Sequence, residues 1–200
     1  ETPPDMAVAD ILVYLDAGRG DEAVNLLEEL REGLQTSLST LVARATVHVA
    51  LAQGRMDAAL DAHRQASEAV ESGYLQGLIR PALLGDLGLI RDHAGDYAGA
   101  VESFRAASAL SPDGRYYRGA GRALRRAGSL DEAEAELGKA LRLIPADPLA
   151  HLEMALLMET RGDTRTAVEH LKSALAVWEN ADEDYEPAQH ARAKLAELSR

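Results

Sequence analysis

The chain has 200 residues, 46% hydrophobic and 27% charged, which fits one soluble domain of ordinary size or a repeat array and excludes a disordered chain. Its 33 acidic and 21 basic residues give a formal net charge of −12, which argues against nucleic acid or anionic lipid as the partner of the whole surface. The absence of cysteine excludes disulfides and thiol chemistry, and no apolar stretch approaches the roughly 18 to 20 residues of a membrane span.

Five glycines are each followed, five residues later, by an alanine. The pairs are Gly18 and Ala23, Gly54 and Ala59, Gly95 and Ala100, Gly128 and Ala133, and Gly162 and Ala167. The alanines are 36, 41, 33 and 34 residues apart, and a period of 33 to 34 residues is typical of a solenoid. Except at His63, which we interpret as a buried, hydrogen-bonded histidine, apolar residues stand four and seven positions after each alanine. This spacing marks one face of a helix.

Each repeat is predicted to be a helix, a short glycine turn and a second helix. The expected ranges are about 4–36, 37–73, 74–113, 114–147 and 148–180, followed by a capping helix at about 184–199. In the second unit we expect the second helix from Met56 to about Ser72, and the next helix begins near Pro81. Gly88 and Gly121 stand midway along first helices, where a small residue lets two antiparallel helices approach closely. Trp178 is expected to pack against the capping helix, which covers the open apolar end of the array.

The segments AGDYAGAVESFRAASALSP (94–112) and AGSLDEAEAELGKALRLIP (127–145) resemble second helices of the tetratricopeptide repeat (TPR) family. The resemblance covers residues 4–179. It implies an all-α fold, a right-handed superhelical solenoid of about five helix pairs plus the C-terminal capping helix. It also implies that the first helices line a concave groove, from which side chains contact peptides of partner proteins.

Residues suited to catalysis or metal binding are scattered. No HExxH or GxSxG motif occurs, so we predict no metal site, no cofactor and no enzyme activity. The histidines lie one per predicted helix: His48, His63, His93, His151, His170 and His190. RGD occurs at 19–21 and 161–163, and we interpret both copies as turns in which glycine takes a positive φ and aspartate caps the next helix.

Basic residues are concentrated in the fourth unit, where residues 113–147 hold seven basic and six acidic side chains. Five arginines fall within an arc of roughly 100° on its first helix. We call them the arginine stripe: Arg115, Arg118, Arg122, Arg125 and Arg126. Tyr117, Ala120, Gly121 and Leu124 lie on a different arc, which faces the packed interior.

The TPR resemblance places the arginine stripe in the concave groove. The other groove-facing residues that it implies are Arg44, His48, Leu12, Leu89, Leu152 and Leu156. Arginine binds carboxylates in bidentate fashion, so we predict that Arg118, Arg122 and Arg125 take the carboxylates of an acidic segment with apolar anchors. In the alternative, acidic residues of the neighbouring first helices pair with the stripe and no ligand binds there. These residues are Asp86, Asp92, Glu153 and Glu159.

The sequence therefore predicts a non-catalytic scaffold whose partner is another protein or peptide of acidic character, and not nucleic acid or a membrane. The alternative is a homo-oligomerising structural or regulatory module of a larger protein, in which the acidic turn Asp182–Glu186 of one copy docks on the arginines of another. We expect a cytoplasmic location, although a periplasmic one also tolerates the absence of cysteine. The start at Glu1, without Met or a signal sequence, indicates a piece of a longer chain.

Overall fold

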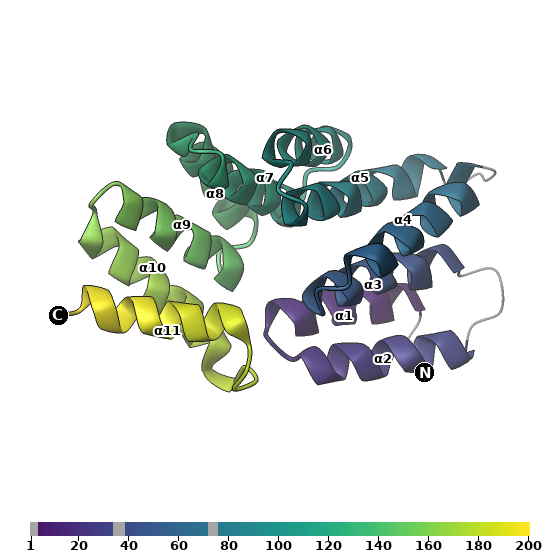
Figure 1. Ribbon diagram of the computed structural model, residues 1–200, viewed down its shortest axis with the longest axis horizontal. Coiled ribbons are helices and arrows are strands. Elements are labelled where there is room, and N and C mark those ends of the chain that lie inside the picture. The colour runs from purple at the N-terminus through teal and green to yellow at the C-terminus, as the bar shows by residue number, and fades with distance from the viewer. Residues whose placement is uncertain (1–3, 34–38, 72–75) are drawn as a thin grey trace.

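The computed structural model describes residues 4–33, 39–71 and 76–200, in which it forms eleven α-helices, one short 3-10 helix and no strand. The helices form five antiparallel pairs and one last helix (Figure 1). The pairs are α1 (Pro4–Asp16) with α2 (Gly20–Gly33), α3 (Ser39–Ala52) with α4 (Met56–Glu71), α5 (Gln76–His93) with α6 (Tyr97–Leu110), α7 (Gly114–Arg126) with α8 (Leu130–Leu143), and α9 (Pro148–Thr160) with α10 (Thr164–Val177). The chain ends with η2 (Trp178–Asn180) and α11 (Glu186–Leu198). The predicted all-α solenoid is confirmed.

Each pair turns at one of the predicted glycines. Gly18, Gly54, Gly95, Gly128 and Gly162 have φ between 69° and 84°. A side chain there is strained, which explains the glycine at this position of every repeat. At Gly128 the N–H donates to the carbonyl of Arg125 (3.0 Å) and the next N–H donates to that of Leu124 (2.9 Å), which satisfies the end of α7. The alanine five residues after each turn glycine is fully buried.

The first RGD copy differs from the prediction. Its turn glycine is Gly18, whereas Gly20 has no positive φ and is the first residue of α2. The interpretation was wrong there because the turn lies two residues earlier. It holds for the second copy, in which Gly162 has φ 77° and Asp163 caps α10 by accepting from the Thr166 N–H.

α5 begins earlier than predicted. It starts at Gln76, five residues before Pro81, which lies inside the helix. Proline is common in a first turn, and the prediction used that preference. Here the helix continues on both sides of the ring, at the cost of the backbone hydrogen bond that the Pro81 nitrogen is unable to donate. α4 is described to Glu71, and Ser72 lies outside the described residues.

Small residues in the first helices allow close packing within the pairs, as predicted. A Cβ atom on Gly88 would lie 2.8 Å from the ring of Phe104 on α6. A Cβ atom on Gly121 would lie 2.6 Å from Cγ of Leu137 on α8. Both distances are well inside van der Waals contact, so neither site has room for a larger residue without movement.

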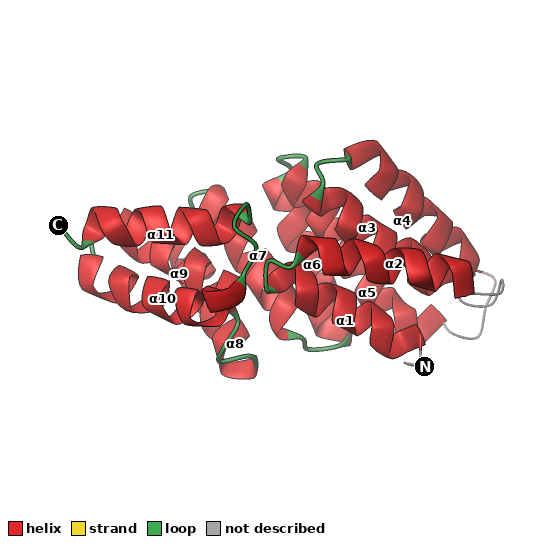
Figure 2. Ribbon diagram, turned by 90° about the horizontal axis from the view of Figure 1, so that it is seen from below, coloured by secondary structure: helices red, strands yellow, loops and turns green. Residues whose placement is uncertain are grey.

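α11 covers the C-terminal end of the array. Its Ala188 and Ala191 are fully buried in a cluster with Trp178, which confirms the predicted packing of this tryptophan. The solenoid also curls until its two ends meet. The α1–α2 turn lies beside the segment that joins α10 to α11 (Figures 1 and 2), and the indole N–H of Trp178 donates to the carbonyl of Asp16 at 2.9 Å.

Candidate functional site

α7 divides into a buried face and an arginine face. Asp113 caps its N-terminus by accepting from the Arg115 N–H at 2.8 Å. Ala120, Ala123 and Leu124 are buried against the neighbouring helices. The arginine stripe occupies the remaining arc, as the 100° spacing predicts.

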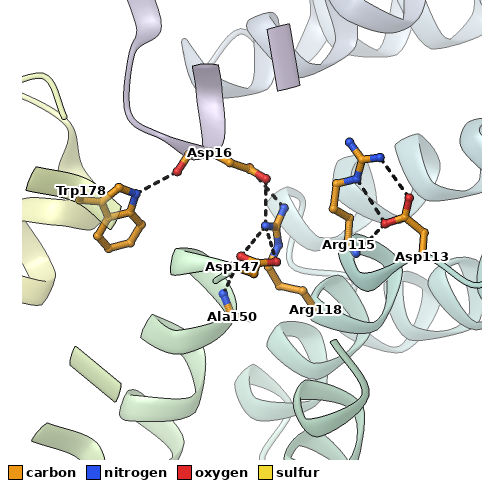
Figure 3. A network of polar contacts seen from close by, with 7 residues as sticks. All are labelled: Asp16, Asp113, Arg115, Arg118, Asp147, Ala150 and Trp178. Atoms are coloured by element: carbon orange, nitrogen blue, oxygen red, sulfur yellow. Dashed lines mark hydrogen bonds and ion pairs between the residues drawn. The ribbon is translucent and has the colours of Figure 1, made fainter. Parts of the chain in front are cut away.

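Arg118 lies between two carboxylates from different parts of the chain (Figure 3). Its Nη1 is 2.8 Å from Oδ1 of Asp147 and 3.0 Å from Oδ2 of Asp16. Burial opposes the charge, but Asp16 and Asp147 together raise the pKa of Arg118, so the guanidinium stays cationic. Asp147 also caps α9 by accepting from the Ala150 N–H at 3.0 Å. One carboxylate thus fixes the start of α9 and orients Arg118.

Asp92 pairs with two arginines of the stripe. Its side chain is fully buried at the end of α5, and its Oδ2 lies 2.8 Å from Nη2 of Arg122 and 3.0 Å from Nη1 of Arg126. The Arg122 contact is an ion pair without hydrogen-bond geometry, since Nε and Nη2 of Arg122 have no hydrogen-bond partner among the described residues. Arg126 also stacks over the ring of Tyr97, with its guanidinium carbon 4.6 Å from the ring centroid.

The other two arginines have one carboxylate each. Nη2 of Arg115 lies 3.0 Å from Oδ2 of Asp113, its near neighbour in sequence. Nε of Arg125 donates to Glu153 on α9 at 2.7 Å. Every arginine of the stripe therefore has a carboxylate partner within the chain.

The internal pairing differs in detail from the one that the sequence suggested. Asp92 and Glu153 do pair with the stripe. Asp86 instead holds Arg44 and His48, and Glu159 holds Lys194 on α11. The remaining partners were not anticipated: Asp16, Asp113 and Asp147. Asp113 and Asp147 were recognisable as aspartates just before helices, but nothing local places Asp16 near α7.

Arg44 and His48 lie on α3 and share the buried carboxylate of Asp86 on α5. The Arg44 Nε is 2.8 Å and the His48 Nε2 2.9 Å from its oxygens. Burial alone would raise the pKa of Asp86, but His48 and Arg44 outweigh it and hold the pKa below its usual value. Both residues were predicted to contact a peptide, and here both tie α3 to α5.

The predicted apolar lining is divided between surface and core. Leu89 and Leu156 are partly buried and pack against the clusters around Phe104 and Trp178. Leu152 is 5% exposed and belongs to the Trp178 cluster, so the expectation that it faces a ligand is wrong.

Two histidines that are distant in sequence come together. Nδ1 of His151 lies 2.8 Å from Nδ1 of His170, and Nε2 of His151 contacts the carbonyl of Pro145 at 3.0 Å. Sequence spacing gave no sign of this pair. No group of three or more potential metal ligands occurs in the described residues. His63 contacts the Leu83 carbonyl at 3.1 Å, which confirms its hydrogen bond, but the side chain is only partly buried and not buried as predicted.

Stacked antiparallel helix pairs with a polar stripe on one first helix define an α-helical repeat protein. A family model described as tetratricopeptide repeat matches residues 85–148, from the middle of α5 to the first residue of α9. Residues 85–148 therefore form tetratricopeptide repeats, and the helix pairs on either side of them continue the same fold. Proteins with such repeats are generally non-catalytic scaffolds for protein–protein interaction.

Solved structures share this fold at low sequence identity. TTC0263, a TPR protein of Thermus thermophilus, is 19% identical with a TM-score of 0.61, over 97% of this chain and 100% of that one. YrrB, described as a TPR protein with an unusual peptide-binding site, is 17% identical with a TM-score of 0.52, over 94% and 90%. A chain of the APC/C hetero-tetramer Cut9–Hcn1 is 20% identical with a TM-score of 0.55, over 97% of this chain but 42% of that one, so this chain spans less than half its length.

No curated protein matches the sequence. Residues 4–33, 39–71 and 76–200 contain no helix with the length and hydropathy needed to cross a bilayer.

Proposed function

We propose that this scaffold binds an acidic segment of a partner protein along the arginine stripe, with Leu89 and Leu156 as apolar contacts and Arg44 and His48 at the margin. One observation carries the proposal. Arg118 binds the carboxylate of Asp16, which comes from α1, 102 residues away, and not from an adjacent repeat. A carboxylate of a partner can take the same place.

The exposures indicate which internal partners a ligand can replace. Asp92 and Asp147 are buried to within 2% and stay with their arginines. Asp16 and Asp113 retain 31% and 27% exposure, so solvent and a ligand can reach both carboxylates. A ligand carboxylate that takes the place of either one restores the ion pair that it displaces, and several such contacts add up in one segment.

Two arginines offer donors to solvent without opening the core. The side chains of Arg115 and Arg126 are 40% and 37% exposed. Each guanidinium has five N–H donors, more than its internal partners use. A ligand that contacts both would lie along the length of α7.

The test is binding of a fluorescein-labelled peptide of alternating Asp-Glu-Leu units, followed by anisotropy. The double variant Arg115→Gln with Arg126→Gln is expected to bind about tenfold more weakly, because two charge-assisted hydrogen bonds are lost. The matched control is Arg142→Gln with Arg165→Gln, which removes the same charge from exposed positions on α8 and α10. Equal affinity of the two double variants would remove the stripe from the site.

The alternative, self-association without a peptide ligand, is measured on the same samples by light scattering. A mass that rises with concentration would favour it. A constant monomer mass together with peptide binding favours the scaffold.

A further inference from the structure

The α1–α2 turn, residues 16–20, sits in a polar socket formed by α7 and the segment after α10. Asp16 makes two contacts there (Figure 3). Its carboxylate accepts from Nη1 of Arg118 at 3.0 Å, and its carbonyl accepts from the fully buried indole of Trp178 at 2.9 Å. Asp147 also accepts from Arg118, so the guanidinium keeps one carboxylate partner when Asp16 is removed.

The rest of the turn is recognised through its backbone. The carbonyl of Gly18 accepts from the Asp182 N–H at 2.9 Å, and the N–H of Gly20 donates to the Asp182 carboxylate at 2.9 Å. Gly18 also lies against the ring of Tyr185, where a Cβ atom would overlap the ring atoms. The socket therefore fits an aspartate followed two residues later by glycine.

The repeat itself does not require this contact. Two positions before the turn glycine, the five repeats carry Asp16, Ala52, His93, Arg126 and Thr160. Only the first repeat has a carboxylate there, and its turn meets the opposite end of the array. Asp16 is thus particular to the contact and not to the fold of a repeat.

The contact between the α1–α2 turn and the C-terminal end can be replaced by another peptide. In the described residues, the apolar cluster around Ile11 in the first two pairs and the cluster around Trp178 at the C-terminal end share no member. The two ends are joined by hydrogen bonds, an ion pair and the packing of Gly18 on Tyr185, without a common apolar cluster. Water or another peptide can substitute for such bonds at small net cost.

We infer that Arg118, Trp178 and Asp182 form a peptide-binding site, that the Asp16–Gly20 turn occupies it as an intramolecular ligand, and that a partner segment of the same Asp-X-Gly chemistry displaces the turn. This inference rests on the proposed function, for which it names the ligand. A tethered turn acts at an effective concentration on the order of mM, so it excludes weak anions and yields to a partner that binds more tightly.

The occupancy of the socket by the Asp16–Gly20 turn is measured by the fluorescence of Trp178, the only tryptophan of the chain. Asp16→Asn removes the carboxylate, and Asp182→Ala removes the acceptor for Gly20. We expect each variant to shift the emission to longer wavelength, to increase quenching by acrylamide and to enlarge the radius of gyration in solution scattering. Far-ultraviolet circular dichroism stays unchanged, because no helix loses its own contacts. Asp184→Ala, an exposed aspartate of the same loop, is the matched control.

Binding is tested with labelled peptides of residues 13–22 added to the Asp16→Asn chain, in which the socket is intact and its own occupant is weakened. The natural peptide is expected to bind at least about tenfold more tightly to this chain than to the unaltered one, and to restore the Trp178 emission. Peptides with Asp16→Asn or with Gly18→Val are expected to bind about tenfold more weakly, through loss of the ion pair or the clash with Tyr185.

The outcomes separate the two proposals. If the Trp178 emission and its quenching by acrylamide are the same in both variants as in the unaltered chain, or if no peptide binds, the turn is a permanent part of the fold and the inference is overturned. If the Gly18→Val peptide and the Asp-Glu-Leu probe bind as tightly as the natural peptide and only the Asp16→Asn peptide binds more weakly, the stripe recognises charge alone, which leaves the proposed function standing and overturns the inference. A mass that rises with concentration in the Asp16→Asn chain would show that a second copy, and not a partner, enters the socket.

Discussion

Replacing Asp147 with alanine removes two interactions from the junction of α7 and α9. The carboxylate caps α9 through the Ala150 N–H at 3.0 Å and pairs with Arg118 at 2.8 Å. Loss of an N-cap costs about 1 kcal/mol. Leaving one partner of a buried ion pair alone costs about 3 to 5 kcal/mol, but Arg118 keeps Asp16, so we expect about 2 kcal/mol for this part. The free energy of unfolding should fall by about 3 kcal/mol in total.

Two further variants separate these contributions in urea unfolding followed by circular dichroism. Asp147→Asn keeps a capping oxygen and should lose only the ionic part, about 2 kcal/mol. Asp96→Ala removes the cap of α6, whose exposed carboxylate accepts from the Gly99 N–H at 3.0 Å, and should lose about 1 kcal/mol. If Asp147→Ala and Asp96→Ala are equally destabilised, Arg118 does not depend on Asp147 and the reasoning is refuted.

Three other predictions follow from packing and from protonation. Gly121→Ala should lower stability by about 1 to 3 kcal/mol, because its Cβ would lie 2.6 Å from Leu137, whereas Gly138→Ala on α8, with only Arg142 at 3.5 Å, should gain up to about 1 kcal/mol in urea unfolding. His48 and Arg44 hold the pKa of buried Asp86 below its usual value of about 3.9. The stabilising effect of this carboxylate is therefore present at neutral pH and is lost as the pH falls below about 4. In urea titrations, the unaltered chain should lose more stability than Asp86→Asn between about pH 5 and pH 3. Burial and the neighbouring His151 lower the pKa of His170, so the folded chain binds fewer protons there than the unfolded chain. The folded state therefore loses stability as the pH falls through about 6.5. In thermal unfolding, His170→Gln should lose less stability than the unaltered chain between about pH 7 and pH 5, and an equal loss would contradict the assignment.

The helix pairs were predictable because the signals that form them are local. A glycine such as Gly128 sets the turn by its own φ, and Ala133, five residues later, meets the preceding helix at a fixed distance along the chain. The partners Asp92 and Glu153 were also within reach, since first helices of adjacent repeats lie side by side. The start of α5 was missed because proline is favoured in the first turn of a helix, whereas Pro81 lies inside α5.

The ion pair between Asp16 and Arg118 could not be predicted from local sequence patterns. Their meeting depends on the rotation between successive helix pairs, which accumulates over the whole array, and a small change per repeat would separate the two ends. The sequence did hold one sign of it, the aspartate two positions before Gly18 that no other turn shares. The His151–His170 contact is of the same kind, because neither residue belongs to a recognisable ligand spacing.

The bond between Asp16 and Trp178 joins residues 162 positions apart, and it alters how the array as a whole unfolds. In a linear array each unit senses only its neighbours, so opening starts at whichever end is weaker and proceeds inward. Here hydrogen bonds and an ion pair join the first repeat to the segment after the fifth, so opening at one end is coupled to the other. A substitution that breaks the Asp16 contacts should therefore speed amide exchange at both ends.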